Sequence, residues 1–188
     1  MPLKSFLSIT AVVLMLSGCM SPDGETAQDK RQAAQQMKNE TLAELYQLEP
    51  QAREQISHAE GYAVFSNVGI YVILLSAGNG YGVVEDNETG AVHYMKMATG
   101  GVGLGLGVKD FRGVFVFTTR EALDQFVESG WDASAQADAA AKSEDKGDAW
   151  AGSVDVAPGI KLYQITKNGL ALQATVQGTK YWKDEELS

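Results

Sequence analysis

The chain has 188 residues, of which 45% are hydrophobic and 21% are charged, and this composition is ordinary for a globular domain. The formal net charge is −9 and no run of basic residues offsets it, which argues against nucleic acid as a partner. Cys19 is the single cysteine, so a disulfide framework is excluded and packing must stabilise the fold.

The first 18 residues are typical of a lipoprotein signal peptide. Lys4 supplies a positive charge, and the apolar stretch over residues 6–16 is too short for a transmembrane helix. The segment ends in Leu16-Ser17-Gly18-Cys19, which resembles the bacterial lipobox, whose cysteine thiol accepts lipid. We therefore expect residues 1–18 to be removed and Cys19 to be acylated.

The residue after the cysteine bears on the location of the anchored protein. Met20 stands where an aspartate would favour retention in the inner membrane. We therefore expect a protein that is lipid-anchored in the bacterial cell envelope, in the outer membrane and facing the periplasm. Its acyl chains would provide the membrane contact.

A polar tether over residues 19–29 is expected to precede an amphipathic helix and the domain, residues 30–188. Residues 25–60 hold seven acidic and four basic residues, so the charge that favours an interfacial helix is missing. Packing of the apolar stripe on the core is the preferred interpretation, and membrane contact is the alternative. Pro50 suits the first turn of a second short helix that ends before Gly61. Candidate membrane-contact residues on the first helix are Met37, Leu42, Leu45 and Tyr46.

From residue 62 the pattern changes to short runs rich in Val, Ile, Tyr and Phe, separated by turn residues. Turns are predicted at Gly78-Asn79-Gly80, at residues 86–90 and at Lys167-Asn168-Gly169, where Asn-Gly favours a hairpin. Tyr181-Trp182-Lys183 is interpreted as a strand end followed by a solvated acidic tail. The predicted strands span residues 62–68, 70–76, 81–85, 91–97, 113–117, 161–166 and 170–177.

Four glycines alternate with aliphatic residues: Gly101, Gly103, Gly105 and Gly107. Neither a complete dinucleotide fingerprint nor a P-loop is present, and no helix is predicted to follow. The period of two instead predicts a strand with a bare glycine face. Because each interior strand glycine costs up to about 1 kcal/mol relative to alanine, such a row indicates that something approaches the backbone closely. The candidates are a helix, a neighbouring strand across a tight barrel, or an acyl chain.

A further helix is predicted over residues 119–128, with Thr118 and Glu121 forming a capping box. Its buried stripe would contain Leu123, Phe126 and Val127. Residues 132–142 alternate small and polar residues with the period of a strand, although their alanine content favours a helix. We prefer the extended form and leave both open.

Together the elements predict an α+β fold. Its body is β-rich, either a largely antiparallel sheet or barrel-like, with an N-terminal helical segment and one short helix after the central strands. A series of motifs follows in order along the chain: Ala59-Glu60-Gly61, Val64-Phe65-Ser66-Asn67-Val68, Gly80-Tyr81-Gly82-Val83-Val84, the glycine strand, Val114-Phe115-Val116-Phe117, Gly130-Trp131-Asp132-Ala133-Ser134-Ala135 and Asn168-Gly169-Leu170. This order of motifs resembles the SYLF lipid-binding domain family, in its bacterial lipoprotein branch, over about residues 35–182. The resemblance implies a compact, non-enzymatic domain associated with lipid membranes.

Signals for catalysis are weak. His58 and His93 are the only histidines, and neither zinc spacing nor a nucleophile elbow is present. Asp86 and Glu88 are interpreted as part of a solvated turn and not as a calcium site. We therefore expect no enzyme, no cofactor and no metal site.

The sequence leaves two functions open. The first is a membrane-anchored, periplasm-facing lipoprotein with a non-enzymatic domain that binds lipid or membrane, with phospholipid as a candidate ligand. The alternative is a cell-envelope protein-interaction or structural module that binds no lipid beyond its own anchor.

Overall fold

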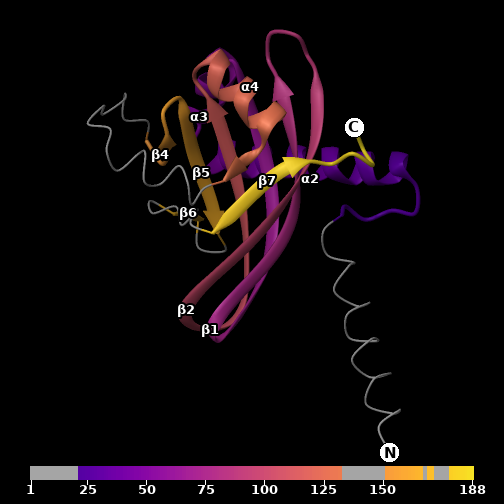
Figure 1. Cartoon of the computed structure of the whole chain (residues 1–188). Coiled ribbons are helices and arrows are strands. Elements are labelled where there is room, and N and C mark those ends of the chain that lie inside the picture. Colours follow the sequence, from indigo (N-terminus) through magenta and orange to yellow (C-terminus); the bar gives the residue numbers. More distant parts are fainter. Residues whose placement is uncertain (1–20, 133–150, 167–168, 172–177) are drawn as a thin grey trace, which may run out of the picture.

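The computed structural model describes residues 21–132, 151–166, 169–171 and 178–188. In these ranges the protein has an α+β fold with one curled sheet, in which every strand pairing is antiparallel (Figure 1). The predicted fold class is confirmed. The signal peptide, Cys19 and residues 133–142, whose strand or helix assignment was left open, lie outside the described residues.

Two helices open the described chain, α2 (Ala27–Leu48) and α3 (Ala52–His58). The Thr26 side chain accepts a hydrogen bond from the Asp29 amide at 3.1 Å, and the Asp29 carboxylate accepts one from the Thr26 amide at 3.0 Å. This capping box starts α2 three residues before the predicted domain boundary at residue 30. The second helix is present as the sequence predicts, but Pro50 precedes its N-cap, Gln51, and does not lie in its first turn.

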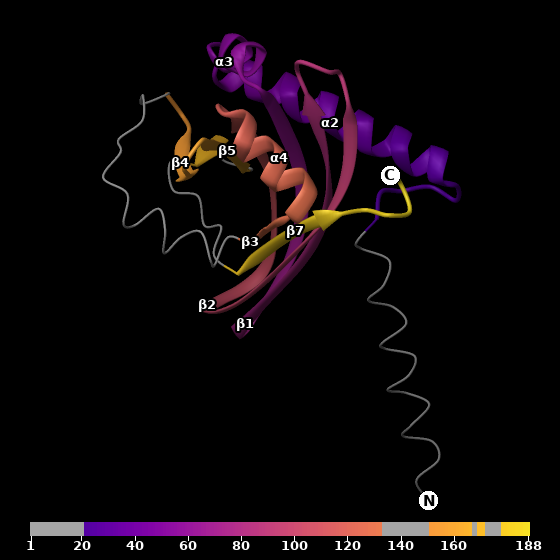
Figure 2. The same ribbon diagram turned by 45° about the horizontal axis from the view of Figure 1, so that its top comes forward.

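The centre of the fold is a two-stranded ribbon formed by β1 (Gly61–Asp86) and β2 (Val92–Phe117). The strands pair from Gly61 opposite Phe117 to Glu85 opposite Val92, and the predicted turn joins them. In that turn the Asp86 amide donates to the Ala91 carbonyl at 3.0 Å. Figures 1 and 2 show that the ribbon bends back on itself, so each strand contributes two arms.

The turn predicted at Gly78-Asn79-Gly80 is wrong, because β1 runs through it without a break. A Cβ atom at Gly80 would collide with the Ser66 carbonyl oxygen, and one at Gly82 would collide with the Phe65 ring. These glycines therefore allow the two arms of β1 to approach each other closely. The separate strands predicted on either side of Gly69 are likewise parts of β1.

The remaining elements complete the sheet around the ribbon. The strand order is β3-β7-β2-β5-β4, with β1 paired to β2 and β6 paired to β5. Thr166 lies opposite Gly169, which confirms the predicted hairpin as far as Ala171. The elements are α4 (Arg120–Ser129), β3 (Trp131–Asp132), β4 (Val154–Ala157), β5 (Ile160–Thr166), β6 (Gly169–Ala171) and β7 (Thr179–Lys183).

The N-terminus of α4 differs from the prediction by one residue. Thr119, not Thr118, is the N-cap, and its hydroxyl accepts from the Ala122 amide at 3.4 Å. The Thr118 amide instead donates to the Gly159 carbonyl at 2.9 Å, which ties this residue to the start of β5. The capping box of Thr118 and Glu121 is therefore wrong, whereas Leu123 and Phe126 are buried as predicted.

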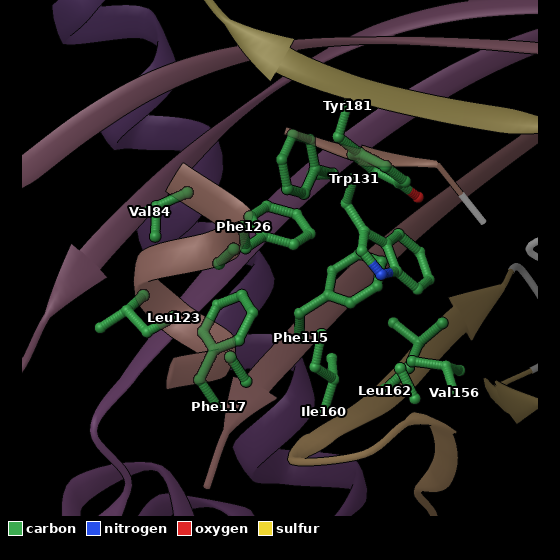
Figure 3. Close-up of a cluster of buried hydrophobic side chains, with 14 of the residues drawn as sticks. Val84, Phe115, Phe117, Leu123, Phe126, Trp131, Val156, Ile160, Leu162 and Tyr181 are labelled. Atoms are coloured by element: carbon green, nitrogen blue, oxygen red, sulfur yellow. The ribbon is translucent and has the colours of Figure 1, made fainter. Parts of the chain in front are cut away.

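Alternating residues of β1, β2 and β5 face two hydrophobic clusters, one on each side of the sheet. The aromatic cluster packs under α4 and β7, and its rings meet at angles and distances typical of edge-to-face contacts (Figure 3). The helix-side cluster lies under α2 and α3. The rings of the aromatic cluster belong to Phe65, Phe115, Phe117, Phe126, Trp131 and Tyr181, and the helix-side cluster includes Leu42, Leu45, Ile56, Tyr62, Val64, Val114, Val116, Tyr163 and Ile165.

The C-terminal tail is not solvated throughout, contrary to the prediction. Asp184 and Leu187 are 1% and 2% exposed. The Lys96 ammonium lies 3.0 Å from the Asp184 carboxylate, and the Arg31 guanidinium donates to the Leu187 carbonyl at 2.9 Å. The tail thus packs beside β2 and the first turns of α2.

Candidate functional site

The glycine-rich stretch lies in the middle of β2, and its predicted strand conformation is confirmed. Gly105 and Gly107 lie opposite Ile73 and Tyr71 of β1, and Gly101 lies opposite Ser76. Between Gly105 and Gly101 the register shifts. Ile73 pairs with Gly105 and Leu75 pairs with Val102, so β2 has one residue more than β1 over this segment. This β-bulge around Gly103 places Gly101 out of phase with Gly105 and Gly107, so the glycines do not form one continuous row.

The same stretch forms what we call the ribbon bend, residues 70–77 of β1 and 100–108 of β2, which pair from Ile70 opposite Val108 to Ala77 opposite Gly100. On one side of it β2 pairs with β7 over residues 95–99, and on the other it pairs with β5 over residues 112–117. Across the bend, β2 pairs only with β1 in the described part of the chain. Both views place the bend at the end of the molecule away from α2, α3 and α4 (Figures 1 and 2).

The ribbon carries no charge over a long stretch of its sequence. Residues 61–84 of β1 contain no Asp, Glu, Lys or Arg, and neither do residues 97–108 of β2. In a soluble hairpin one face is normally polar. In residues 70–75, by contrast, apolar residues occupy both alternating sets of positions. Such a two-sided apolar pattern is expected of a segment that meets an apolar environment on both faces.

The predicted face of the N-terminal helix has a different role. Leu42 and Leu45 of α2 are buried against the sheet, and Met37 and Tyr46 pack partly buried against the same cluster. This packing agrees with the interpretation of a stripe packed on the core, and membrane contact by these four residues stays a prediction. Among the described helices, none is long and apolar enough to cross a membrane.

The charged turn of the ribbon lies at the end opposite the bend. Arg120 of α4 makes ion pairs there with Asp86 at 2.6 Å, and with Glu60 and Glu88 at 3.0 Å each. The hydrogen bond from Arg120 holds the pKa of Asp86 well below its ordinary value. Glu60, Asp86 and Glu88 therefore share one arginine, which the sequence did not predict because Arg120 lies in a different element.

The two histidines are far from forming a shared site. His58 ends α3, where its Nδ1 atom lies 2.8 Å from the Glu54 carbonyl, and its side chain lines a groove of about 380 Å³ with Gln51. His93 lies in β2 and lines a separate groove of about 460 Å³ beside Asp124. No group of three or more His, Cys, Asp or Glu side chains that could hold a metal ion occurs within the described ranges.

Comparison with known proteins gives one informative likeness. No family model matches the chain. The chain is 32% identical over 168 residues to "Beta cell expansion factor A" of Aeromonas veronii, and the alignment covers 87% of this chain. It covers 61% of the relative, so the chain spans about three fifths of that protein's length.

Proposed function

We propose that the protein is a lipoprotein whose domain binds membrane lipid without catalysing a reaction. Its anchor would be the acylated Cys19 in the outer membrane, with the domain facing the periplasm. The chain and its relative from Aeromonas veronii would share a SYLF-type domain. Loss of palmitate labelling in a Cys19→Ser variant tests the anchor.

The observation that carries this proposal is the uncharged ribbon bend. Its backbone projects beyond the strands β5 and β7, and the sequence on both of its strands lacks charge. Burial of apolar surface from water is favourable by about 25 cal/mol per Å², so an apolar projection favours contact with hydrocarbon. The net charge of −9 opposes attraction to anionic headgroups, so we expect the contact to be hydrophobic and insensitive to salt.

The bend matches the dimensions of one leaflet. We measure from Leu104, which adjoins the β-bulge of the bend, to Lys109, the next charged residue of β2. The five residue steps between them extend about 17 Å in a strand. Half of the hydrocarbon core of a bilayer is about 15 Å thick. Among the described residues, the two-stranded ribbon has no sheet partner for its outer backbone groups at the bend. Unpaired backbone groups are costly in hydrocarbon, so we expect the contact to involve one leaflet and not a crossing.

Vesicle flotation with the Cys19→Ser chain tests the proposal, because this chain lacks the predicted acylation site. We expect it to float with neutral vesicles at low and at high salt. Leu104→Asp, which places a charge in the bend, should abolish flotation without lowering the melting temperature by more than the control does. The control is Val92→Asp at the other end of the ribbon, where Val92 is 39% exposed.

If the Leu104→Asp and Val92→Asp chains float equally well, the bend is not the contact. A Cys19→Ser chain that never floats, but purifies with a stoichiometric envelope protein, would favour the alternative protein-interaction function.

A further inference from the structure

The segment between the predicted acylation site and the folded domain is short. Pro22 is buried, although it lies only three residues after Cys19. From Thr26 onward the chain is fixed by the capping box that starts α2. Because three residues extend at most about 11 Å, an acylated Cys19 would hold Pro22 within that distance of the membrane surface.

The first turns of α2 are fixed to one level of the ribbon. The Gln35 amide donates to the Tyr94 hydroxyl at 3.3 Å. The Arg31 guanidinium donates to the Leu187 carbonyl at 2.9 Å. The tail that contains Leu187 is held by β2 in turn, because the Asp184 amide donates to the Tyr94 carbonyl at 2.8 Å. The start of α2 therefore lies beside Tyr94 of β2.

The residues that precede α2 reach the ribbon at nearly the same level. Tyr94 lies opposite Val83, and Tyr81 precedes Val83 by two residues in β1. Burial, and then the Asp23 carboxylate, raise the pKa of Tyr81 above its ordinary value, so Asp23 lies near this tyrosine. Figures 1 and 2 show that the described chain starts on the side of α2 that faces the ribbon bend.

This short connection excludes one orientation on the membrane. If the bend pointed away from the anchoring membrane, the turn at residues 86–90 would lie between Tyr81 and that membrane. The turn begins five residue steps after Tyr81, which extend about 17 Å in a strand. Helix α3 adds to this thickness, because the Asn87 amide donates to the Ile56 carbonyl at 2.7 Å. The three residues after Cys19 span only about 11 Å and cannot reach past this end.

The opposite orientation fits the same dimensions. The bend begins at Ala77, four residue steps from Tyr81, or about 13 Å along the strand. With Pro22 about 11 Å from the membrane surface, the start of the bend would lie at that surface and the rest of the bend beyond it. No charged residue occurs in residues 61–84, so the part of β1 that leads into the bend does not oppose this approach.

We propose that the ribbon bend enters the same leaflet that holds the acyl chains of Cys19, so that the protein is attached to one membrane at two points. This inference rests on the proposed lipid-binding function and names the membrane that the bend contacts. The anchor keeps the bend at a high effective concentration beside its leaflet, so the two attachments together hold more strongly than either alone. The bend does not bridge to a second membrane.

The test uses the acylated full chain with Leu104→Cys, in which the new thiol is the only free one because Cys19 is blocked. The thiol is labelled with a nitrobenzoxadiazole dye, and the protein is bound through its anchor to donor vesicles of neutral phosphatidylcholine. Acceptor vesicles of the same lipid are added. Doxyl-labelled phosphatidylcholine, which quenches the dye on contact, is placed in the donor vesicles or in the acceptor vesicles.

We expect a loss of emission when the doxyl lipid is in the donor vesicles and no loss when it is in the acceptor vesicles. The control is the acylated chain labelled at Val92→Cys, at the other end of the ribbon, which neither set of vesicles should quench. Quenching at position 104 by acceptor vesicles alone would overturn the proposal, because the bend would then contact a second membrane. Donor quenching at position 92 equal to that at position 104 would also overturn it.

The Cys19→Ser chain labelled at Leu104→Cys and mixed with doxyl-containing vesicles tests the proposed function separately. If this chain is quenched but the acylated chain is not quenched by its donor vesicles, the shared leaflet is refuted and the proposed function stands. If neither chain is quenched, both are refuted.

Discussion

At the scale of single residues, Lys38 joins α2 to the sheet. Its side chain is 10% exposed, and its ammonium lies 2.5 Å from the Glu85 carboxylate, which also accepts from the Tyr62 hydroxyl at 2.9 Å. Burial alone raises the pKa of Glu85, but the hydrogen bonds from Lys38 and Tyr62 outweigh it and hold this pKa below its ordinary value. Burial, and then Glu85 itself, raises the pKa of Tyr62 well above its ordinary range.

Replacing the lysine tests this buried group. Lys38→Met leaves the Glu85 carboxylate, whose side chain is 30% exposed, without its cation, so we expect a loss of about 1–3 kcal/mol in the free energy of unfolding at neutral pH, measured in urea. Lys30→Met, whose partner Glu186 has a side chain 51% exposed, should cost less than about 1 kcal/mol. Equal losses in the two variants would show that the Lys38 pair does not stabilise the fold.

The same group gives a pH dependence. Because the folded-state pKa of Glu85 is depressed, its stabilisation is complete above the unfolded-state pKa and is lost as the pH falls through the folded value. Between about pH 5 and about pH 3 the wild type should therefore lose more stability than Lys38→Met. In the variant, burial without a cation raises the Glu85 pKa, so protonation is no longer destabilising.

At the scale of elements, the start of α4 offers a matched pair of threonines. Because Thr119 caps the helix, Thr119→Ala should lower the free energy of unfolding by about 1 kcal/mol. Thr118→Ala should change it little, because only the Thr118 backbone amide is used. Thermal denaturation of the two variants measures both losses of stability. A larger loss of stability for Thr118→Ala than for Thr119→Ala would show that Thr118 is the N-cap, as the sequence predicted.

The fold-back of β1 is tested by its glycines. A Cβ at Gly80 would meet the Ser66 carbonyl oxygen, whereas one at Gly100 would meet nothing within 4 Å. Gly80→Ala should therefore destabilise the protein by about 1–3 kcal/mol or prevent folding, and Gly100→Ala should have little effect. Circular dichroism melts of both give the comparison, in which a neutral Gly80→Ala would contradict the close approach of the two arms.

Local patterns in the sequence predict elements, whereas contacts between distant segments leave no local pattern. Helix and strand types followed from local periodicity, whereas α3 was predicted from Pro50 and the 86–90 turn and the Asn168-Gly169 hairpin from their turn residues. Gly78-Asn79-Gly80 has the composition of a turn, but its glycines serve a contact with Ser66, which is distant in sequence. The buried side-chain oxygens of Asn67 and Gln164, which have no hydrogen-bond partner in the described part of the protein, gave no signal in the sequence, because only the tertiary structure reveals whether a polar atom has a partner.

At the scale of the whole molecule, charge and apolar surface are separated along the ribbon. The turn that joins β1 to β2 is held by Arg120 and its carboxylate partners at one end, and the uncharged bend lies at the other (Figure 1). The two clusters of the core lie on opposite sides of the sheet, one under α4 and the other under α2 and α3. We relate this polarity to a protein that meets a lipid surface with one end.

The most direct test of membrane contact through the ribbon bend is an environment-sensitive label in the ribbon. Two single-cysteine variants of the Cys19→Ser chain are made, one with Leu104→Cys and one with Val92→Cys. Each is labelled at its cysteine with a nitrobenzoxadiazole dye, and neutral vesicles are added. We predict a blue shift and a rise in emission for the label at position 104 and no change for the label at position 92. No change at position 104, or a change only at position 92, would contradict this contact.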